Sequence, residues 1–148
     1  MPRRYAEGTT VSVESSRGQI TGILTAHGVK RQAWASDEEK GGTLHFELAG
    51  YQFRFFIEKP TAQSLYDQWM RDGHRSMKWM PSDSQVDAEW RRRWRANVLL
   101  LKAKLEFAEG EASTVLRELL PYAVLKDGRV LEQAILDGGT VPLLTAGQ

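Results

Sequence analysis

Residues 43–58 have the sequence TLHFELAGYQFRFFIE, and this stretch decides the fold. Apolar side chains occupy every second position on both sides of a central Ala49-Gly50 pair, with Phe56 as the exception. Such alternation is typical of strands that bury one face, and a short glycine-containing connection between two runs is typical of a hairpin. Pro60 ends the second run because proline has no backbone N–H to donate to a sheet. The stretch therefore predicts two antiparallel strands.

More strands and a first helix are expected upstream of this hairpin. Residues 32–36 form another strand-like run, and the polar residues 37–42 separate it from the hairpin, so the three runs predict an antiparallel meander. Residues 9–14 also alternate and predict a short strand of their own. Between these strands, residues 16–19 fit a capping box, and apolar residues follow at helical spacing until Gly28. This spacing predicts a helix of about three turns.

The strongest helical pattern begins near Ser84 and ends at Gly110. Its apolar residues fall on one stripe, which suits a helix that packs on a sheet. The stripe comprises Trp90, Trp94, Val98, Leu101, Leu105 and Ala108. Leu99 and Leu100 lie off this stripe, so we expect either the C-terminal segment or a partner subunit to cover them.

The remaining segments have weaker patterns. Periodicity fades in residues 61–83, which predicts a long loop of a length that is often functional or mobile. Ser113 is expected to cap a short helix, followed by a small hairpin over residues 122–131 and a further helical turn over residues 131–136. We therefore expect one α+β domain over residues 1–148, in which strand, helix, three-stranded antiparallel meander and long helix precede a short C-terminal helix and hairpin. Its parts are residues 9–60 (strand, helix and meander), 61–83 (loop), 84–136 (helical C-terminal half) and 137–148 (tail).

Composition is that of an ordinary globular domain and excludes several kinds of site. The 148 residues are 41% hydrophobic and 26% charged, with a mean hydropathy of -0.45. No cysteine is present, which excludes disulfides, thiolate metal sites and cysteine nucleophiles. The longest apolar run, residues 98–101, is too short to cross a membrane and no signal-peptide core is found, so we expect a cytoplasmic protein. With a net charge of +1, any electrostatic function has to be local.

No pattern in the sequence indicates a catalytic or metal centre. His27, His45 and His74 lack the spacing of metal-binding pairs, and the acidic residues 37–39 are typical of a solvated turn. No P-loop, dinucleotide-binding glycine motif or nucleophile elbow is found. We therefore expect no metal, no cofactor and no catalytic residue, and a hydrolase that uses His74 is the weakest of the alternatives considered.

Basic and aromatic residues are interleaved between residues 69 and 95. Proteins hold single-stranded nucleic acid in this way, with cations that neutralise phosphates and aromatic rings that stack on bases. Helical geometry places Trp90 and Trp94 in the core, so Trp69 and Trp79 are the better candidates for stacking. The residues predicted to contact nucleic acid are Trp69, Arg71, Arg75, Lys78, Trp79, Arg91, Arg92 and Arg95.

The arginine run at residues 91–93 also has a purely structural interpretation. It may be read as a charged helix N-terminal turn in which Asp87 and Glu89 pair locally with the arginines. Cations near a helix N-terminus oppose the helix dipole, at a cost of a few tenths of a kcal/mol each. A phosphate or an acidic partner protein would offset that cost.

Three segments give the chain a family resemblance: RYAEGT at residues 4–9, RRWRA with KAKLE at residues 92–106, and VLKDGR at residues 124–129. Through them the whole chain resembles a family of small uncharacterised proteins of tailed bacteriophages and prophages. The resemblance implies no activity that can be carried over, and it favours DNA recombination, replication or counter-defence over metabolism. Residues 61–84 depart most from the family pattern.

Two functional hypotheses follow. In the first, the chain is a non-catalytic phage-type accessory protein that binds nucleic acid, specifically single-stranded DNA, in recombination or replication. The expected order of elements is similar to that of double-stranded RNA-binding and strand-annealing folds, although fold does not imply function. In the second, it is a protein-binding module, an oligomeric scaffold or an inhibitor of a host defence enzyme, which uses Leu99, Leu100 and the loop tryptophans. Salt separates the two, because phosphate contacts weaken steeply with salt.

Overall fold

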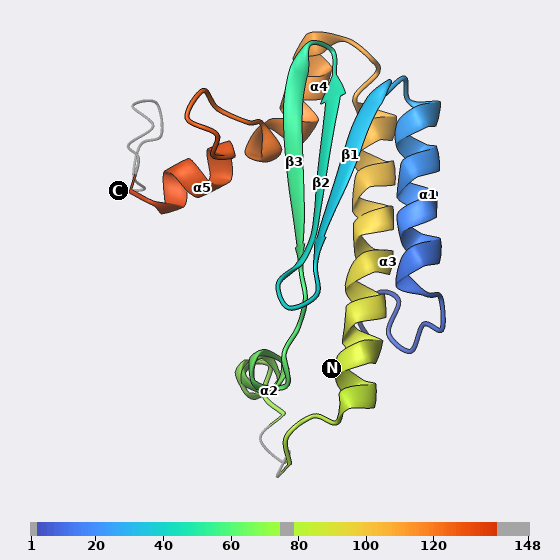
Figure 1. The fold of residues 1–148 in the computed structure, drawn as a ribbon, viewed down its shortest axis with the longest axis vertical. Coiled ribbons are helices and arrows are strands. Elements are labelled where there is room, and N and C mark those ends of the chain that lie inside the picture. The colour runs from blue at the N-terminus through green and yellow to red at the C-terminus, as the bar shows by residue number, and fades with distance from the viewer. Residues whose placement is uncertain (1–2, 75–78, 139–148) are drawn as a thin grey trace.

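The computed structural model describes residues 3–74 and 79–138. It has an α+β fold in which a helix precedes a three-stranded sheet and further helices follow it (Figure 1). The elements are α1 Val13–Ala26, β1 Arg31–Asp37, β2 Gly41–Leu48, β3 Tyr51–Glu58, α2 Ala62–Arg71, α3 Asp83–Phe107, α4 Ala112–Leu119, the 3-10 helix η1 Leu120–Tyr122 and α5 Leu131–Leu136. Helices α1 and α3 lie side by side, and α5 stands apart from them, beyond β3 (Figure 1).

The sheet is the predicted antiparallel meander, in the order β1-β2-β3. Its β2–β3 hairpin turns at Ala49-Gly50, where both residues have positive φ, of 54° and 83°. Positive φ at both central residues matches the twist of the flanking strands and allows a two-residue connection. The register pairs Leu44 with Phe55 and Phe46 with Phe53, which places the apolar residues of both strands on one face.

Helices α1 and α3 cover this apolar face. Ile20 and Leu24 of α1 and the predicted stripe of α3 join the strand residues in one buried cluster, with Trp90 packed at its margin. Trp94 lies against β1 and β2, since its ring centroid is 5.4 Å from that of Trp34 and its edge approaches Gly42. The predicted position of the long helix is confirmed to within a few residues at each end.

The opposite face of the sheet is polar and carries no helix packed flat on it. It presents His45 on β2 and Arg54, Phe56 and Glu58 on β3, and the ring of Phe56 is 57% exposed. A sheet with one apolar and one polar face is the usual result of period-two alternation. The C-terminal segment reaches this side by bridging Ala123 to Phe53 at the free edge of β3.

The predicted N-terminal strand at residues 9–14 is wrong. Ser12 instead caps α1, because its side chain accepts a hydrogen bond from the Ser15 backbone N–H at 3.1 Å, and the helix begins at Val13. Ser16, predicted as the cap, lies buried within the helix. Two serines four residues apart offer alternative starts, and the earlier one prevails because it lets Ser16 contact α3.

The prediction of an uninterrupted loop over residues 61–83 is also wrong, since α2 occupies much of it. Thr61 and Ser64 form a reciprocal capping box, at 3.0 Å and 2.8 Å, and Leu65 one position later is buried. A capped first turn with a buried anchor stabilises a short helix that its periodicity alone only weakly indicates. The predicted contacts Arg75 and Lys78 lie outside the described residues.

The C-terminal elements follow the prediction with two differences. A single bridge between Val124 and Val130 forms the small hairpin, and α5 occupies the predicted helical turn. Helix α4 begins at Ala112 without a side-chain cap, so Ser113 does not cap it. The expectation that this segment covers Leu99 and Leu100 is wrong, because both remain exposed, at 46% and 37%.

Gly41 is the residue of the sheet least able to accept a side chain. Its φ is 132°, and a Cβ there would collide with the Ile57 carbonyl oxygen and lie 2.9 Å from the Lys59 nitrogen. We expect Gly41→Ala to lower the free energy of unfolding by about 2 kcal/mol or more, as measured by denaturant unfolding. Gly18→Ala is the matched control, because its Cβ would meet open space in α1 and should raise stability by up to about 1 kcal/mol. Equal effects of both substitutions would contradict this account of the sheet.

Candidate nucleic-acid interface

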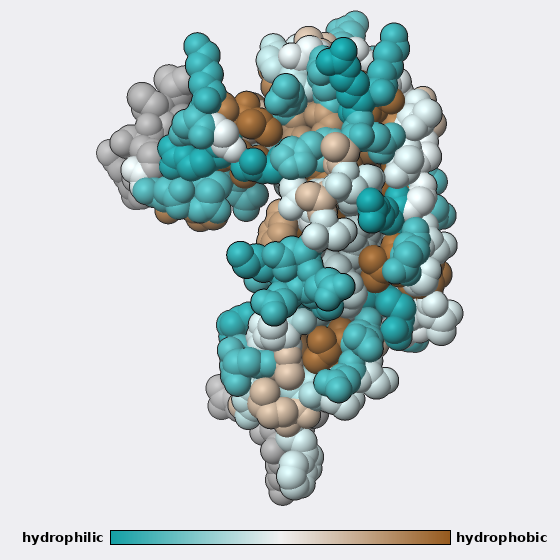
Figure 2. All heavy atoms as spheres, viewed as in Figure 1, coloured by the Kyte–Doolittle hydropathy of each residue, from teal (hydrophilic) through white to brown (hydrophobic). Residues whose placement is uncertain are grey.

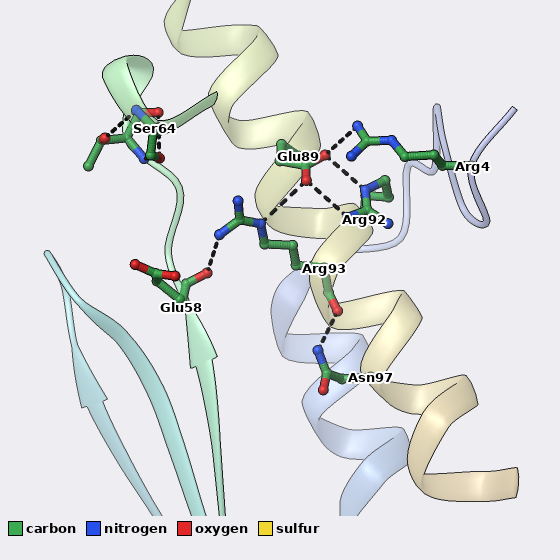
Figure 3. Close-up of polar contacts among 8 residues, drawn as sticks. Arg4, Glu58, Ser64, Glu89, Arg92, Arg93 and Asn97 are labelled. Carbon is green, nitrogen blue, oxygen red and sulfur yellow. Dashed lines mark hydrogen bonds and ion pairs between the residues drawn. The ribbon is translucent and has the colours of Figure 1, made fainter. Parts of the chain in front are cut away.

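A buried carboxylate organises one end of α3. Glu89 is 5% exposed and is contacted by three guanidinium groups, those of Arg4, Arg92 and Arg93 (Figure 3). Arg92 binds both carboxylate oxygens, at 2.8 Å and 3.0 Å, while Arg93 and Arg4 approach to 3.3 Å and 3.1 Å. We call these four residues the Glu89 cluster. A buried charge is stable only when partners replace its lost hydration, so the cluster holds the N-terminal segment on α3.

The protonation of Glu89 is set by opposing effects. Burial by itself would raise the pKa of Glu89, because it disfavours the charged form. The hydrogen bond and charge of Arg92, the charge of Arg4 and the hydrogen bond from Arg93 outweigh burial and hold the pKa below its ordinary value. Glu89 is therefore ionised at neutral pH.

The neighbouring arginines connect α3 to other parts of the chain. Arg93 donates to the Glu58 carbonyl oxygen at the end of β3, at 2.9 Å (Figure 3). Arg91 donates to the Thr9 carbonyl oxygen at 3.3 Å, and Arg95 donates to Ser16 Oγ at 3.2 Å. The local pairing of the arginine run with Glu89 is thus confirmed. The run also has a function in folding, because it joins α3 to the N-terminal segment, α1 and β3.

A pocket of about 180 Å³ opens beside the Glu89 cluster. It lies between the N-terminal segment, α2 and α3, and its lining includes Trp69 of α2 together with Arg4 and Arg92. Nη1 of Arg4 is buried and has no hydrogen-bond partner among the residues that the structure describes. A buried donor without an acceptor costs free energy, which an oxygen of a bound anion would recover.

The structure brings together only part of the predicted set of contacts. Trp69 and Arg92 line the same pocket, whereas Arg71 is exposed at the last residue of α2. Trp79 is 82% exposed shortly before α3 begins. Arg91 and Arg95 are half-buried and each commits one N–H to an internal acceptor.

Sequence reasoning missed Arg4, which lies 85 positions from its partner Glu89. Its place in a basic N-terminal segment was the only available signal, and that pattern is typical of a tail. The contact exists because the chain turns at residues 5–8 before α1 begins, which returns Arg4 to the start of α3.

The histidines and acidic residues form no second centre. Within residues 3–74 and 79–138, no group of three or more His, Asp or Glu side chains is arranged to hold a metal ion. His74 is exposed, and His27 lies 3.7 Å from Glu106. No helix in the described part of the chain is long and apolar enough to span a membrane.

Comparison with known proteins leaves the function to be argued from this geometry. No family model, curated protein or solved structure matches the chain. The resemblance to proteins of tailed bacteriophages and prophages therefore stays a prediction.

We expect Glu89→Gln to lower the free energy of unfolding by about 3 kcal/mol at pH 7, because it leaves three arginines without their counter-charge. Since the pKa of Glu89 is lower in the folded than in the unfolded state, its contribution is complete above the unfolded pKa and is lost as pH falls through the folded pKa. The gap between wild type and variant should therefore shrink below about pH 4. Urea unfolding from pH 3 to pH 8 measures both effects.

Asp87→Asn is the control for this experiment, because Asp87 is exposed on the same helix. It should change stability by less than about 0.5 kcal/mol. A gap between wild type and Glu89→Gln that stays constant with pH would contradict the assigned role of Glu89.

Proposed function

We propose that this protein binds single-stranded nucleic acid, without catalysing a reaction, at the pocket between Trp69 and the Glu89 cluster. The observation that carries the proposal is the meeting of an indole ring with two guanidinium groups, one of which has a buried nitrogen without a partner. An aromatic ring beside cations is the arrangement that stacks a base and neutralises its phosphate. A phage-type accessory role in recombination or replication is the setting we propose for this binding.

The charge around the pocket favours an anion. Three guanidinium groups surround one carboxylate, so the Glu89 cluster keeps an excess of two positive charges. Arginine carries five N–H donors, so Arg92 retains donors for a ligand while it binds Glu89. Glu7 also lines the pocket and reduces the excess, which limits the site to one or two phosphates.

The size of the pocket favours a single strand over a duplex. About 180 Å³ has room for one base ring or one phosphate group. A base reaches such a pocket only when it is unstacked and unpaired, as in single-stranded DNA or RNA. Exposed Trp79 and Arg71 lie in or beside the segment between α2 and α3, where they are placed to contact the neighbouring nucleotides.

The test is fluorescence anisotropy of a labelled single-stranded oligonucleotide titrated with the protein. We expect affinity to fall about ten-fold between roughly 50 mM and 200 mM salt, as neutralisation of two phosphates predicts. Trp69→Ala and Arg4→Gln should each weaken binding by about ten-fold at low salt, because they remove the stacking surface and the unpartnered donor.

Arg3→Gln is the matched control, since Arg3 is the adjacent exposed arginine and donates to the Glu7 carbonyl oxygen instead of contributing to the pocket. Its affinity for the oligonucleotide should equal that of wild type. No binding by the wild type at low salt, or equal losses in Arg3→Gln and Arg4→Gln, would refute the proposed function.

A protein-binding surface is the second candidate, and a separate observation favours it. Leu99, Leu100 and Phe107 are exposed on α3, with Phe107 at 71%, and Ala103 between them is exposed as well. Their spacing places them on one face of the helix. Exposed apolar residues that lie together are typical of a surface that associates with another protein or a second copy.

We expect the double variant Leu99→Lys/Leu100→Lys to abolish self-association of the protein without unfolding it, because both residues are exposed. Sedimentation equilibrium gives the association state, and thermal unfolding checks the fold. Lys102→Gln, a change at an exposed position of the same helix, should leave association unchanged. A wild-type protein that is monomeric at high concentration would rule out a second copy as the partner.

A further inference from the structure

The polar face of the sheet forms the floor of a second cavity, on the opposite side of the sheet from α1 and α3. This groove has a volume of about 660 Å³ and is walled by α5 and the segment that precedes it. Figure 2 shows the surface hollowed between the body of the molecule and the part that contains α5. The volume lies within the range of small-molecule sites, which is about 300 to 1,000 Å³.

A half-buried cation lies on the groove floor without a counter-charge. Arg54 lines the groove and forms no ion pair with any carboxylate of the described residues. His45 lies directly opposite it on β2. Burial, and then the positive charge of Arg54, hold the pKa of His45 below its ordinary value, so the ring is neutral at pH 7. This end of the groove therefore lacks an anion.

The residues that follow along β3 have a different character. Phe56 comes next on the same face, with its ring largely exposed, and Glu58 follows it. The carboxylate of Glu58 points away from α3 (Figure 3), and Glu132 of α5 lines the same groove. Because same-face residues on a strand are about 6.6 Å apart, Arg54 and Glu58 lie about 13 Å apart with the ring between them.

We propose that this groove binds a single nucleotide, with its phosphate on Arg54 and His45, its ring on Phe56, and its N–H or O–H donors on Glu58 and Glu132. The order of charges along β3 carries the proposal, since a nucleotide has an anion, a planar ring and hydrogen-bond donors in the same sequence and over a similar length. The inference is independent of the strand-binding pocket beside Trp69.

Other occupants fit this groove less well. A polynucleotide that continued past Phe56 would bring a second phosphate towards Glu58 and Glu132, which repel it. An extended peptide gains affinity by pairing with a free sheet edge, and the floor of this groove is a sheet face whose backbone groups are paired with neighbouring strands.

The experiment is isothermal titration calorimetry of the full chain with adenosine 5′-monophosphate, and separately with ribose 5-phosphate and adenosine. We expect adenosine monophosphate to bind about ten-fold more tightly than either fragment, because only it reaches both ends of the groove. Arg54→Gln should weaken its binding by about ten-fold, and Phe56→Ala by about five-fold. Thermal unfolding confirms that the variants are folded.

Arg31→Gln is the matched control, because Arg31 lies on the same face of the sheet but does not line the groove. It should leave the affinity unchanged. An NMR titration of the His45 ring adds an independent readout, since a bound phosphate should raise the pKa of His45. The charged groups near His45 are Arg54 and Glu132 in this groove and Arg31 and Glu47 at the adjoining end of the face, and none of them changes protonation near neutral pH.

The outcomes separate this inference from the strand-binding proposal. Adenosine monophosphate that binds no more tightly than ribose 5-phosphate, or equally well to wild type and Arg54→Gln, would overturn the groove site. Arg4→Gln should leave nucleotide binding intact, because Arg4 lines the other pocket. Nucleotide binding that persists while oligonucleotides fail to bind would support the groove and refute only the strand-binding pocket.

Discussion

The buried carboxylate of Glu89 is the constraint on which the arrangement of the chain ends depends. Low-dielectric surroundings make an unpaired carboxylate costly, so the charge has to be met by cations wherever the chain can supply them. Two come from the next turn of α3, and the third, Arg4, comes from the N-terminal segment. Arg93 also holds the end of β3 through the Glu58 carbonyl oxygen. The pocket beside Trp69 is a consequence of this convergence, because all its walls meet there.

The two faces of the sheet divide the molecule between stability and recognition. One face is buried under α1 and α3 and contains most of the core. The other keeps Arg54, Phe56 and Glu58 accessible, while α5 stands beside them and encloses a groove. Since the core is complete without this second face, its side chains are free to contact a ligand. The proposed strand pocket and nucleotide groove therefore lie on separate surfaces.

The basic and aromatic residues of α3 show how a binding pattern can also be a folding pattern. Trp94 is buried and packs against Trp34 and Gly42, and Trp90 meets its edge with ring centroids 5.6 Å apart. The arginines between them point to Glu89 and to backbone oxygens. Interleaving of tryptophan and arginine thus arises from helical periodicity, with one face in the core and the next at its polar margin.

The sequence by itself determined the elements whose patterns repeat over short distances. Alternation in residues 43–58 specified the hairpin and its buried face, and a 3.6-residue period specified α3. Tertiary structure decided the rest. Ser12 and Ser16 were equally good local caps for α1, and only the contact of Ser16 with Arg95 distinguishes them. The pairing of Arg4 with Glu89 and the enclosure of Phe56 by α5 join residues far apart in the chain, and no local pattern encodes such contacts because they exist only after the core has formed.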